Sequence, residues 1–217
     1  MHIVIMGGTF DPIHYGHLRG AEEVRETIKA DKVLFIPAAV SPNKTEDEAA
    51  PAEDRLEMVR LATKDNPKFE VSDMEIKRGG KSYTIDTLKE LQKEHPEGTL
   101  LTLVIGSDSY NDIMTWHEYA SIFSYASIVI LPRPRHVPKK IEKFLPVELA
   151  QEFWYDEGKS AYKHNDSGNV VFCLDSTTLD ISSTAVRALN GVNASIKYMV
   201  PPEVEEYIRT KGLYKKK

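Results

Sequence analysis

Residues 2–17 read HIVIMGGTFDPIHYGH, and the first five of them form an almost continuous apolar run. A strand that is buried on both faces of a parallel sheet has this composition. The two glycines that follow permit a sharp turn, and apolar residues at helical spacing predict a helix over residues 17–30. The stretch therefore predicts a strand, a glycine-rich turn and a helix, which together are the building unit of α/β sheets.

The rest of the chain repeats this alternation of short apolar runs with longer amphipathic ones. Strands are predicted at residues 33–36, 69–74, 100–105, 128–131 and 170–174, and helices at residues 53–64, 84–94, 116–123, 183–190 and 202–211. This alternation predicts an α/β fold with a Rossmann-like, doubly wound parallel sheet flanked by helices. We expect a single domain over residues 1–217, with an insertion or elaborated surface region at about residues 133–178, where Pro, Lys and Glu cluster.

Composition and charge exclude several classes of protein. Hydrophobic residues make up 41% of the 217 residues, which is enough for a core and excludes a disordered chain. The single Cys excludes a disulfide framework and a cysteine-based zinc ribbon. The net charge of −5 argues against a broad nucleic-acid-binding face. Apolar runs are too short for a membrane span or a signal peptide, so we expect a cytoplasmic protein without membrane or nucleic-acid partners.

The turn at residues 7–17 carries the first candidate chemistry. Ligands of open α/β sheets bind outside the carboxyl ends of the strands, and free amides at a helix N-terminus favour phosphate. His14 and His17 are three residues apart, so both can face one ligand and donate hydrogen bonds to its phosphate oxygens. The Walker A loop and the Gly-x-Gly-x-x-Gly fingerprint are absent. A two-histidine metal site, which would lack a nearby third ligand, and a purely structural turn are the alternatives.

A second candidate phosphate site lies near the other end of the chain. Residues 181–187 read ISSTAVR, in which Ser182 or Ser183 is a natural helix cap and Arg187 follows one turn later. Hydroxyls and an arginine fork at a helix N-terminus suit a triphosphate. The strings GGTFDPIHYGH and ISSTAVR resemble, in this order, the two signatures of the nucleotidyltransferase superfamily that carries the His-x-Gly-His motif.

Further segments resemble one family of that superfamily, the bacterial nicotinate-mononucleotide adenylyltransferases. They are KSYTIDT at residues 81–87, IGSD at 105–108, WH at 116–117 and GLY at 212–214. The resemblance implies transfer of the adenylyl group of ATP to nicotinate mononucleotide, with His14, His17 and Arg187 as catalytic residues. The ATP-binding residues that it implies are Gly7, Gly8, Thr9, Phe10, His14, His17, Lys44, Gly106, Ser182, Ser183, Thr184 and Arg187. The pyridine-nucleotide-binding residues that it implies are Ser82, Tyr83, Thr84, Asp108, Trp116 and His117.

The resemblance also implies how the substrates are held. Trp116 would stack on the pyridine ring, Thr84 and neighbouring amides would bind the nicotinate carboxylate, and Asp108 would accept from ribose hydroxyls. Mg²⁺ would be bound through the ATP phosphates and would need no dedicated protein cage. A homo-oligomer is compatible with the resemblance. The chain departs from the family pattern in SPNK at residues 41–44 and in Ser107.

Three alternatives remain open from the residues alone. The same chemistry could act on nicotinamide mononucleotide or on phosphopantetheine. The segment 82–87 and Trp116 argue against phosphopantetheine, but they do not separate the acid from the amide. A non-catalytic nucleotide-binding module is disfavoured by the presence of His14, His17 and Arg187. The third alternative is a protein that binds a metal ion through these histidines.

Overall fold

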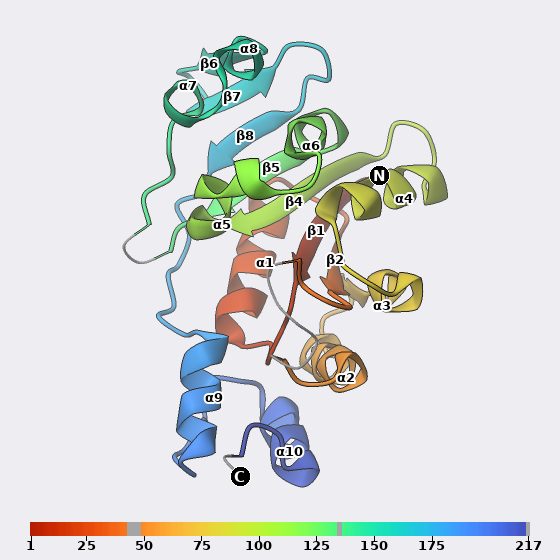
Figure 1. Ribbon diagram of the computed structural model, residues 1–217, viewed down its shortest axis with the longest axis vertical. Helices are drawn as coiled ribbons and strands as arrows, with labels where there is room; N and C mark the ends of the chain where they lie inside the picture. Colours follow the sequence, from red (N-terminus) through yellow and green to blue (C-terminus); the bar gives the residue numbers. More distant parts are fainter. Residues whose placement is uncertain (43–48, 134–135, 216–217) are drawn as a thin grey trace.

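The computed structural model describes residues 1–42, 49–133 and 136–215, and these form an eight-stranded sheet with the order β3-β2-β1-β4-β5-β8-β7-β6 (Figure 1). The strands are β1 (His2–Gly8), β2 (Lys32–Pro37), β3 (Phe69–Val71), β4 (Leu100–Gly106), β5 (Ser127–Leu131), β6 (Phe153–Asp156), β7 (Ala161–His164) and β8 (Val170–Cys173). The first six strands in this order, from β3 to β8, pair with their neighbours in parallel. The predicted α/β class with a doubly wound parallel sheet is therefore confirmed.

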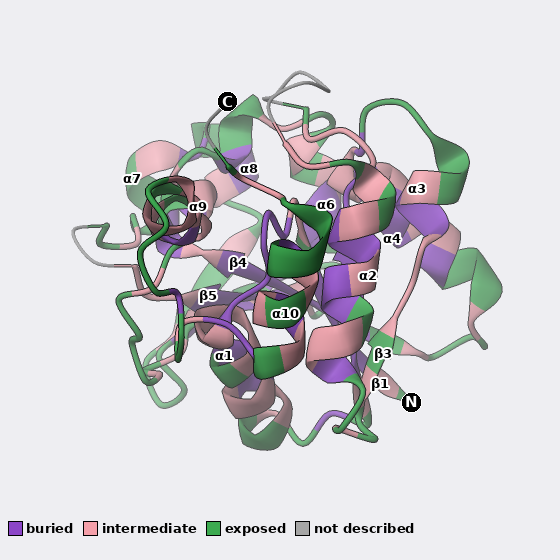
Figure 2. Ribbon diagram, turned by 90° about the horizontal axis from the view of Figure 1, so that it is seen from below, coloured by how far each residue is buried: buried purple, intermediate pink, exposed green. Residues whose placement is uncertain are grey.

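The apolar run of β1 is buried on both faces of the sheet, as its composition predicts. Ile3 and Ile5 belong to one hydrophobic cluster, and Val4 and Met6 belong to the other, because successive side chains of a strand point to opposite faces. The first cluster is covered by α4 (Thr84–Glu94) and α6 (Tyr119–Tyr125); the second is covered by α1 (Tyr15–Thr27), α2 (Ala52–Thr63), α9 (Ser183–Gly191) and α10 (Pro202–Lys211). In Figure 2 strands β4 and β5 are mostly buried behind partly exposed helices. Two helical layers thus enclose the sheet.

Several predicted boundaries are confirmed residue for residue. Helices α4 and α10 begin and end where the apolar spacing places them. Gly212 adopts the left-handed conformation, with φ of 64°, and ends α10 at the predicted position. Ser182 caps α9, because its hydroxyl accepts a 3.1 Å hydrogen bond from the amide of Ala185.

The predicted helix at residues 116–123 is wrong at its start. Residues Ile113–Thr115 form a 3₁₀ turn, η2, which Trp116 ends in an extended conformation, and α6 begins only at Tyr119. Glu118 has a φ of 46°, which no continuous helix contains. The aromatic and apolar spacing of this stretch is the same in both arrangements, so periodicity does not separate them.

Other differences concern short elements next to the strands. Strand β3 stops at Val71 instead of Met74, because Met74–Arg78 forms α3. Ser107–Asn111 forms α5 directly after β4, where the sequence analysis predicts no element. Helix α1 runs from Tyr15 to Thr27, three residues earlier than expected at its C-terminal end.

The segment 133–178 contains regular structure where the composition predicts an irregular surface region. It contains α7 (Ile141–Phe144), α8 (Val147–Ala150), the hairpin β6–β7 and the strand β8. Because β7 pairs antiparallel with β8, the hairpin prolongs the sheet at the end opposite to α9 and α10 (Figure 1). That residues 1–217 form a single domain stays a prediction.

Candidate functional site

A cavity of about 490 Å³ lies at the carboxyl ends of β1 and β4. This is the position at which strand order reverses in the sheet, and it is the usual ligand position of an open α/β fold. The wall formed by residues 176–179 is tied to α1, because the Thr177 amide donates to Glu23 at 2.8 Å. The predicted site residues that line the cavity are Gly7, Gly8, Thr9, His17, Ser82, Tyr83, Thr84, Gly106, Asp108, Trp116 and His117.

The two histidines of the first motif form a stacked pair at the start of α1. His14 caps the helix and is buried, and its ring stacks on that of His17 with centroids 3.7 Å apart. The backbone amide of His14 donates a 3.2 Å hydrogen bond to Nδ1 of His17. In the neutral ring Nε2 of His17 therefore carries the hydrogen and is the donor available to a ligand.

Gly16 packs closely against the His14 ring. A Cβ atom at Gly16 would lie 3.0 Å from the His14 ring, which is closer than side chains normally approach. Nδ1 of His14 is buried and has no hydrogen-bond partner among the described residues. The loop thus holds His14 tightly behind His17 and leaves one of its polar atoms without a protein partner.

Both histidines are uncharged in this structure at neutral pH. Burial, helped by the positive charge of Arg133, lowers the pKa of His14 to about 4. The pKa of His17 lies well below its ordinary value. Burial of the ring is the main cause, and the charges of His14 and Arg133 add to it, although part of the residue keeps access to solvent. A phosphate anion next to the pair would oppose this shift and favour protonation.

Arg133 is a cavity residue that the sequence reasoning missed. It follows β5 with its amide donating 2.9 Å to the Ser107 hydroxyl, and its charge acts on both histidines. Its Nε would lie 3.0 Å from a Cβ atom at Gly106, so that glycine leaves room for the arginine. The available signal was the strand order, which places the end of β5 beside the end of β4, but composition assigned Arg133 to an irregular segment.

The second motif docks on the loop of the first. Ser183 donates a 2.8 Å hydrogen bond to the carbonyl of Pro12, and Nη1 of Arg187 donates a 2.7 Å bond to the carbonyl of Asp11. Nη2 of Arg187 also contacts the Thr184 hydroxyl at 3.4 Å. The structure therefore brings the two predicted phosphate-binding motifs together, although Ser182, Ser183, Thr184 and Arg187 lie outside the cavity lining.

The carboxylate of Asp11 is the centre of a buried network beneath this junction. Its Oδ1 accepts from the hydroxyl of Tyr214 at 2.8 Å and from the amide of Ala50 at 3.1 Å. Its Oδ2 lies 3.5 Å from Nη1 of Arg187. Burial and the charge of Asp11 raise the pKa of Tyr214, so that its hydroxyl stays a donor. The network joins the segment around Tyr214 to residues 7–17, which we call the histidine loop.

Arg55 is a second buried charge close to the loop. It donates hydrogen bonds of 2.7, 2.7 and 2.8 Å to the carbonyls of Thr9, Ala38 and Ala39. It thereby joins the loop after β1 to the chain leaving β2. The sequence reasoning missed both Asp11 and Arg55, because a charged residue in a loop or on a helix is usually exposed and only tertiary packing shows its burial.

An aromatic corner forms the opposite side of the cavity. Tyr83 and His117 have ring centroids 4.6 Å apart, and Trp116 is half-buried beside them. Helix α4 begins at Thr84, which lines the cavity, and no side chain in the described part of the chain caps its first turn. Asp108 is exposed in the first turn of α5 and lines the same cavity.

One predicted ATP-binding residue, Phe10, does not line the cavity. The Phe10 side chain is buried in the core, with its ring edge-on to His17 at a centroid distance of 5.2 Å, so it supports the histidine from behind. Lys44 lies outside the described residues.

Within residues 1–42, 49–133 and 136–215, no group of three or more His, Cys, Asp or Glu side chains is arranged to hold a metal ion. In the same part of the chain, no helix is both long and apolar enough to cross a membrane.

Comparisons with known proteins agree with this architecture. The cytidylyltransferase-like family model matches residues 5–189. Probable nicotinate-nucleotide adenylyltransferases of Geobacter sp. (strain M21) and Geobacter metallireducens are each 48% identical over 214 residues, covering 99% of this chain and 98% of the relative. The Plasmodium falciparum nicotinic acid mononucleotide adenylyltransferase complexed with NaAD has a TM-score of 0.73 at 19% identity, covering 98% of this chain and 97% of that chain, which shows the likeness of fold alone. The chain therefore belongs to the cytidylyltransferase-like family and, within it, to the nicotinate-nucleotide adenylyltransferases.

Proposed function

We propose that the protein transfers the adenylyl group of ATP to nicotinate mononucleotide, giving nicotinate adenine dinucleotide and pyrophosphate. One observation carries the proposal: a single cavity joins the histidine loop with the aromatic corner of Tyr83, Trp116 and His117. The histidine loop suits a phosphate group, and the aromatic corner suits a flat ring. The names of the relatives support the choice of acceptor.

The reaction requires little covalent work from the protein. The acceptor phosphate is already ionised at neutral pH, so its oxygen attacks the α-phosphorus of ATP and the bond to the pyrophosphate oxygen breaks. Positioning and stabilisation of the developing charge supply the catalysis. Mg²⁺ would arrive with ATP as part of the substrate and bridge its phosphate oxygens.

The residues of the histidine loop have distinct parts in this proposal. His17 presents its Nε2 hydrogen to the transferring phosphate, and the stacked His14 holds its ring in place and gains a proton as negative charge approaches. Arg133 adds positive charge on the same side. Arg187, with Ser183 and Thr184, would hold the departing pyrophosphate from the start of α9.

The acid acceptor is favoured over the amide by the start of α4. A helix N-terminus carries a partial positive charge and free amides, which suit a carboxylate better than a neutral carboxamide. Phosphopantetheine has no flat ring to use the aromatic corner of Trp116 and Tyr83. Membership of this enzyme family argues against the different-class alternative, a non-catalytic nucleotide-binding module. Cytoplasmic location and homo-oligomer formation stay predictions.

The proposal is tested by measuring pyrophosphate release from Mg-ATP with nicotinate mononucleotide, nicotinamide mononucleotide and phosphopantetheine in parallel. We expect the highest kcat/KM with nicotinate mononucleotide and no release without an acceptor. Preferred release with one of the other two acceptors would reassign the substrate. No release with any acceptor would show that the protein is not an enzyme of this class.

A further inference from the structure

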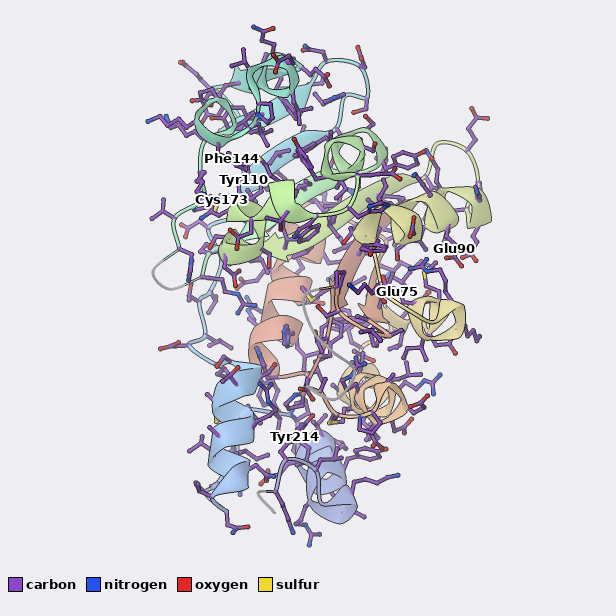
Figure 3. The ribbon with its side chains drawn as sticks, in the orientation of Figure 1. Glu75, Glu90, Tyr110, Phe144, Cys173 and Tyr214 are labelled. Atoms are coloured by element: carbon purple, nitrogen blue, oxygen red, sulfur yellow. The ribbon has the colours of Figure 1, made fainter. Side chains whose placement is uncertain are left out.

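A buried glutamate at the edge of the cavity has no part in the proposed reaction. Glu75 lies in α3, only 6% of its surface is exposed, and it lines the cavity next to Ser82, Tyr83 and Thr84. Figure 3 shows it between α3 and the start of α4. Burial raises the pKa of this carboxyl group, so the site is unfavourable for a charge unless its neighbours compensate.

The neighbours of Glu75 are two hydroxyl groups and one arginine. The Thr87 hydroxyl donates a 2.6 Å hydrogen bond to Oε1 of Glu75, and the nearby Ser82 side chain lowers the pKa of the carboxyl group against the effect of burial. Arg78 lies 3.9 Å from Oε1 and donates a 2.8 Å bond to the Thr87 hydroxyl. Glu90 is the other charged group that faces this cluster.

The contacts of Thr87 fix the direction in which its hydroxyl donates. It already accepts from Arg78, it has one hydrogen to give, and the carboxylate of Glu75 only accepts. The Ser82 hydroxyl accepts from the amide of Ala39 at 3.0 Å. Glu75 therefore holds the Thr87 end of the segment 82–87, and Ala39 holds the Ser82 end.

The segment that Glu75 holds is the one that carries the acceptor side of the cavity. Tyr83 and Thr84 lie between the two tethered hydroxyls, and the Ser82–Ala39 bond ties the segment to the chain leaving β2. Relaxing the tether would move the aromatic ring and the start of α4.

We propose that Glu75 is the positioning residue of the pyridine-nucleotide side: its carboxylate fixes Thr87, and with it the first turns of α4, so that Tyr83 and the start of α4 meet the acceptor. This inference rests on the proposed function. It assigns Glu75 no contact with the reacting atoms, and it predicts an effect confined to one of the two substrates.

The chain offers a matched control in Glu90. Nη1 of Arg78 donates a 2.7 Å bond to Glu90, so Glu90→Gln removes the second carboxylate of the same arginine. Glu90 makes no contact with Ser82 or Thr87 among the described hydrogen bonds, and its side chain is 37% exposed. Figure 3 shows Glu90 further along α4.

The test compares Glu75→Gln, Thr87→Val and Glu90→Gln by steady-state kinetics in which each substrate is varied in turn. The substitution Glu75→Gln removes the charge from the acceptor of the Thr87 hydrogen bond and replaces one oxygen by an amide donor, so we expect the KM for nicotinate mononucleotide to rise about tenfold. We expect the KM for ATP to stay within about twofold, because the side chains proposed to bind ATP are unchanged. Thr87→Val should change the same KM in the same direction, and Glu90→Gln should change neither.

The outcomes separate this inference from the proposed function. Equal rises in both KM values, or no rise in either, for Glu75→Gln would show a merely structural role. If Glu75→Gln fails to fold, as thermal unfolding would show, Thr87→Val decides by the same criterion. Wild-type protein that is active with nicotinate mononucleotide while both variants keep its KM overturns this inference alone. Wild-type protein that is inactive with this acceptor overturns both proposals.

Discussion

The hydrogen bond between Tyr214 and Asp11 allows a quantitative test of the buried network under the histidine loop. Tyr214→Phe removes one hydroxyl and leaves the ring in place. The carboxylate of Asp11 is 2% exposed, so water cannot easily replace the lost donor, and Oδ1 would keep only the amide of Ala50. Oδ2 has no hydrogen bond within the described residues, and Arg187 lies 3.5 Å from it.

The expected magnitude follows from the charge and the burial of the acceptor. A hydrogen bond to a charged group contributes about 1.5–3 kcal/mol, so we expect Tyr214→Phe to lower the free energy of unfolding by about 2 kcal/mol. For a chain of this length, this corresponds to a fall in Tm of about 4–8 °C. Urea denaturation at pH 7 measures the free energy, and a thermal scan measures Tm.

Tyr207 supplies the control for this measurement. Its hydroxyl also donates a 2.8 Å hydrogen bond to an aspartate, Asp54, but the side chain of Asp54 is 18% exposed. Water can take over the lost bond there, so we expect Tyr207→Phe to cost less than about 1 kcal/mol. Equal losses in the two variants, or no loss in Tyr214→Phe, would refute the argument that burial of Asp11 makes its hydrogen bond strong.

The site residues lead to three further predictions. His17→Ala should lower kcat by about 10² to 10³ without unfolding the protein, as expected for the loss of one preorganised donor, and near-normal turnover would remove His17 from the mechanism. Trp116→Ala should raise the KM for the pyridine nucleotide far more than that for ATP, whereas equal rises would indicate a core role. The folded pKa of His14 is about 4 and lies below its unfolded value of 6.5, so the unfolded state binds more protons and stability falls as the pH drops from about 6.5 to 4. Urea denaturation across this window should show that His14→Asn removes about 3 kcal/mol of this fall, and an unchanged slope would contradict the buried neutral imidazole.

Local patterns predicted the parts of the fold in which local and tertiary preferences agree. Residues 84–94 form a helix residue for residue, because their apolar spacing matches the core that they cover. Trp116 was placed in a helix, because its spacing fits a helix and a 3₁₀ turn equally well and the positive φ of Glu118 leaves no sequence signal.

The candidate site shows the same division between local and tertiary information. His14 and His17 could be identified because the chemistry and the turn are contiguous in sequence. Arg133 could not be identified, because its position depends on the order of strands in the sheet. Glu75 and Asp11 could not be identified either, because the burial of a carboxylate depends on the partners that tertiary contacts bring to it.

The bond between Tyr214 and Asp11 joins residues that are 203 positions apart. Asp11 is synthesised 203 residues before Tyr214, so its carboxylate cannot meet this donor until the ribosome has made all of the intervening chain. Domains fold as units once enough of the chain has emerged. We therefore expect a nascent chain that stops before Tyr214 to hold its histidine loop less firmly than a chain translated through this residue.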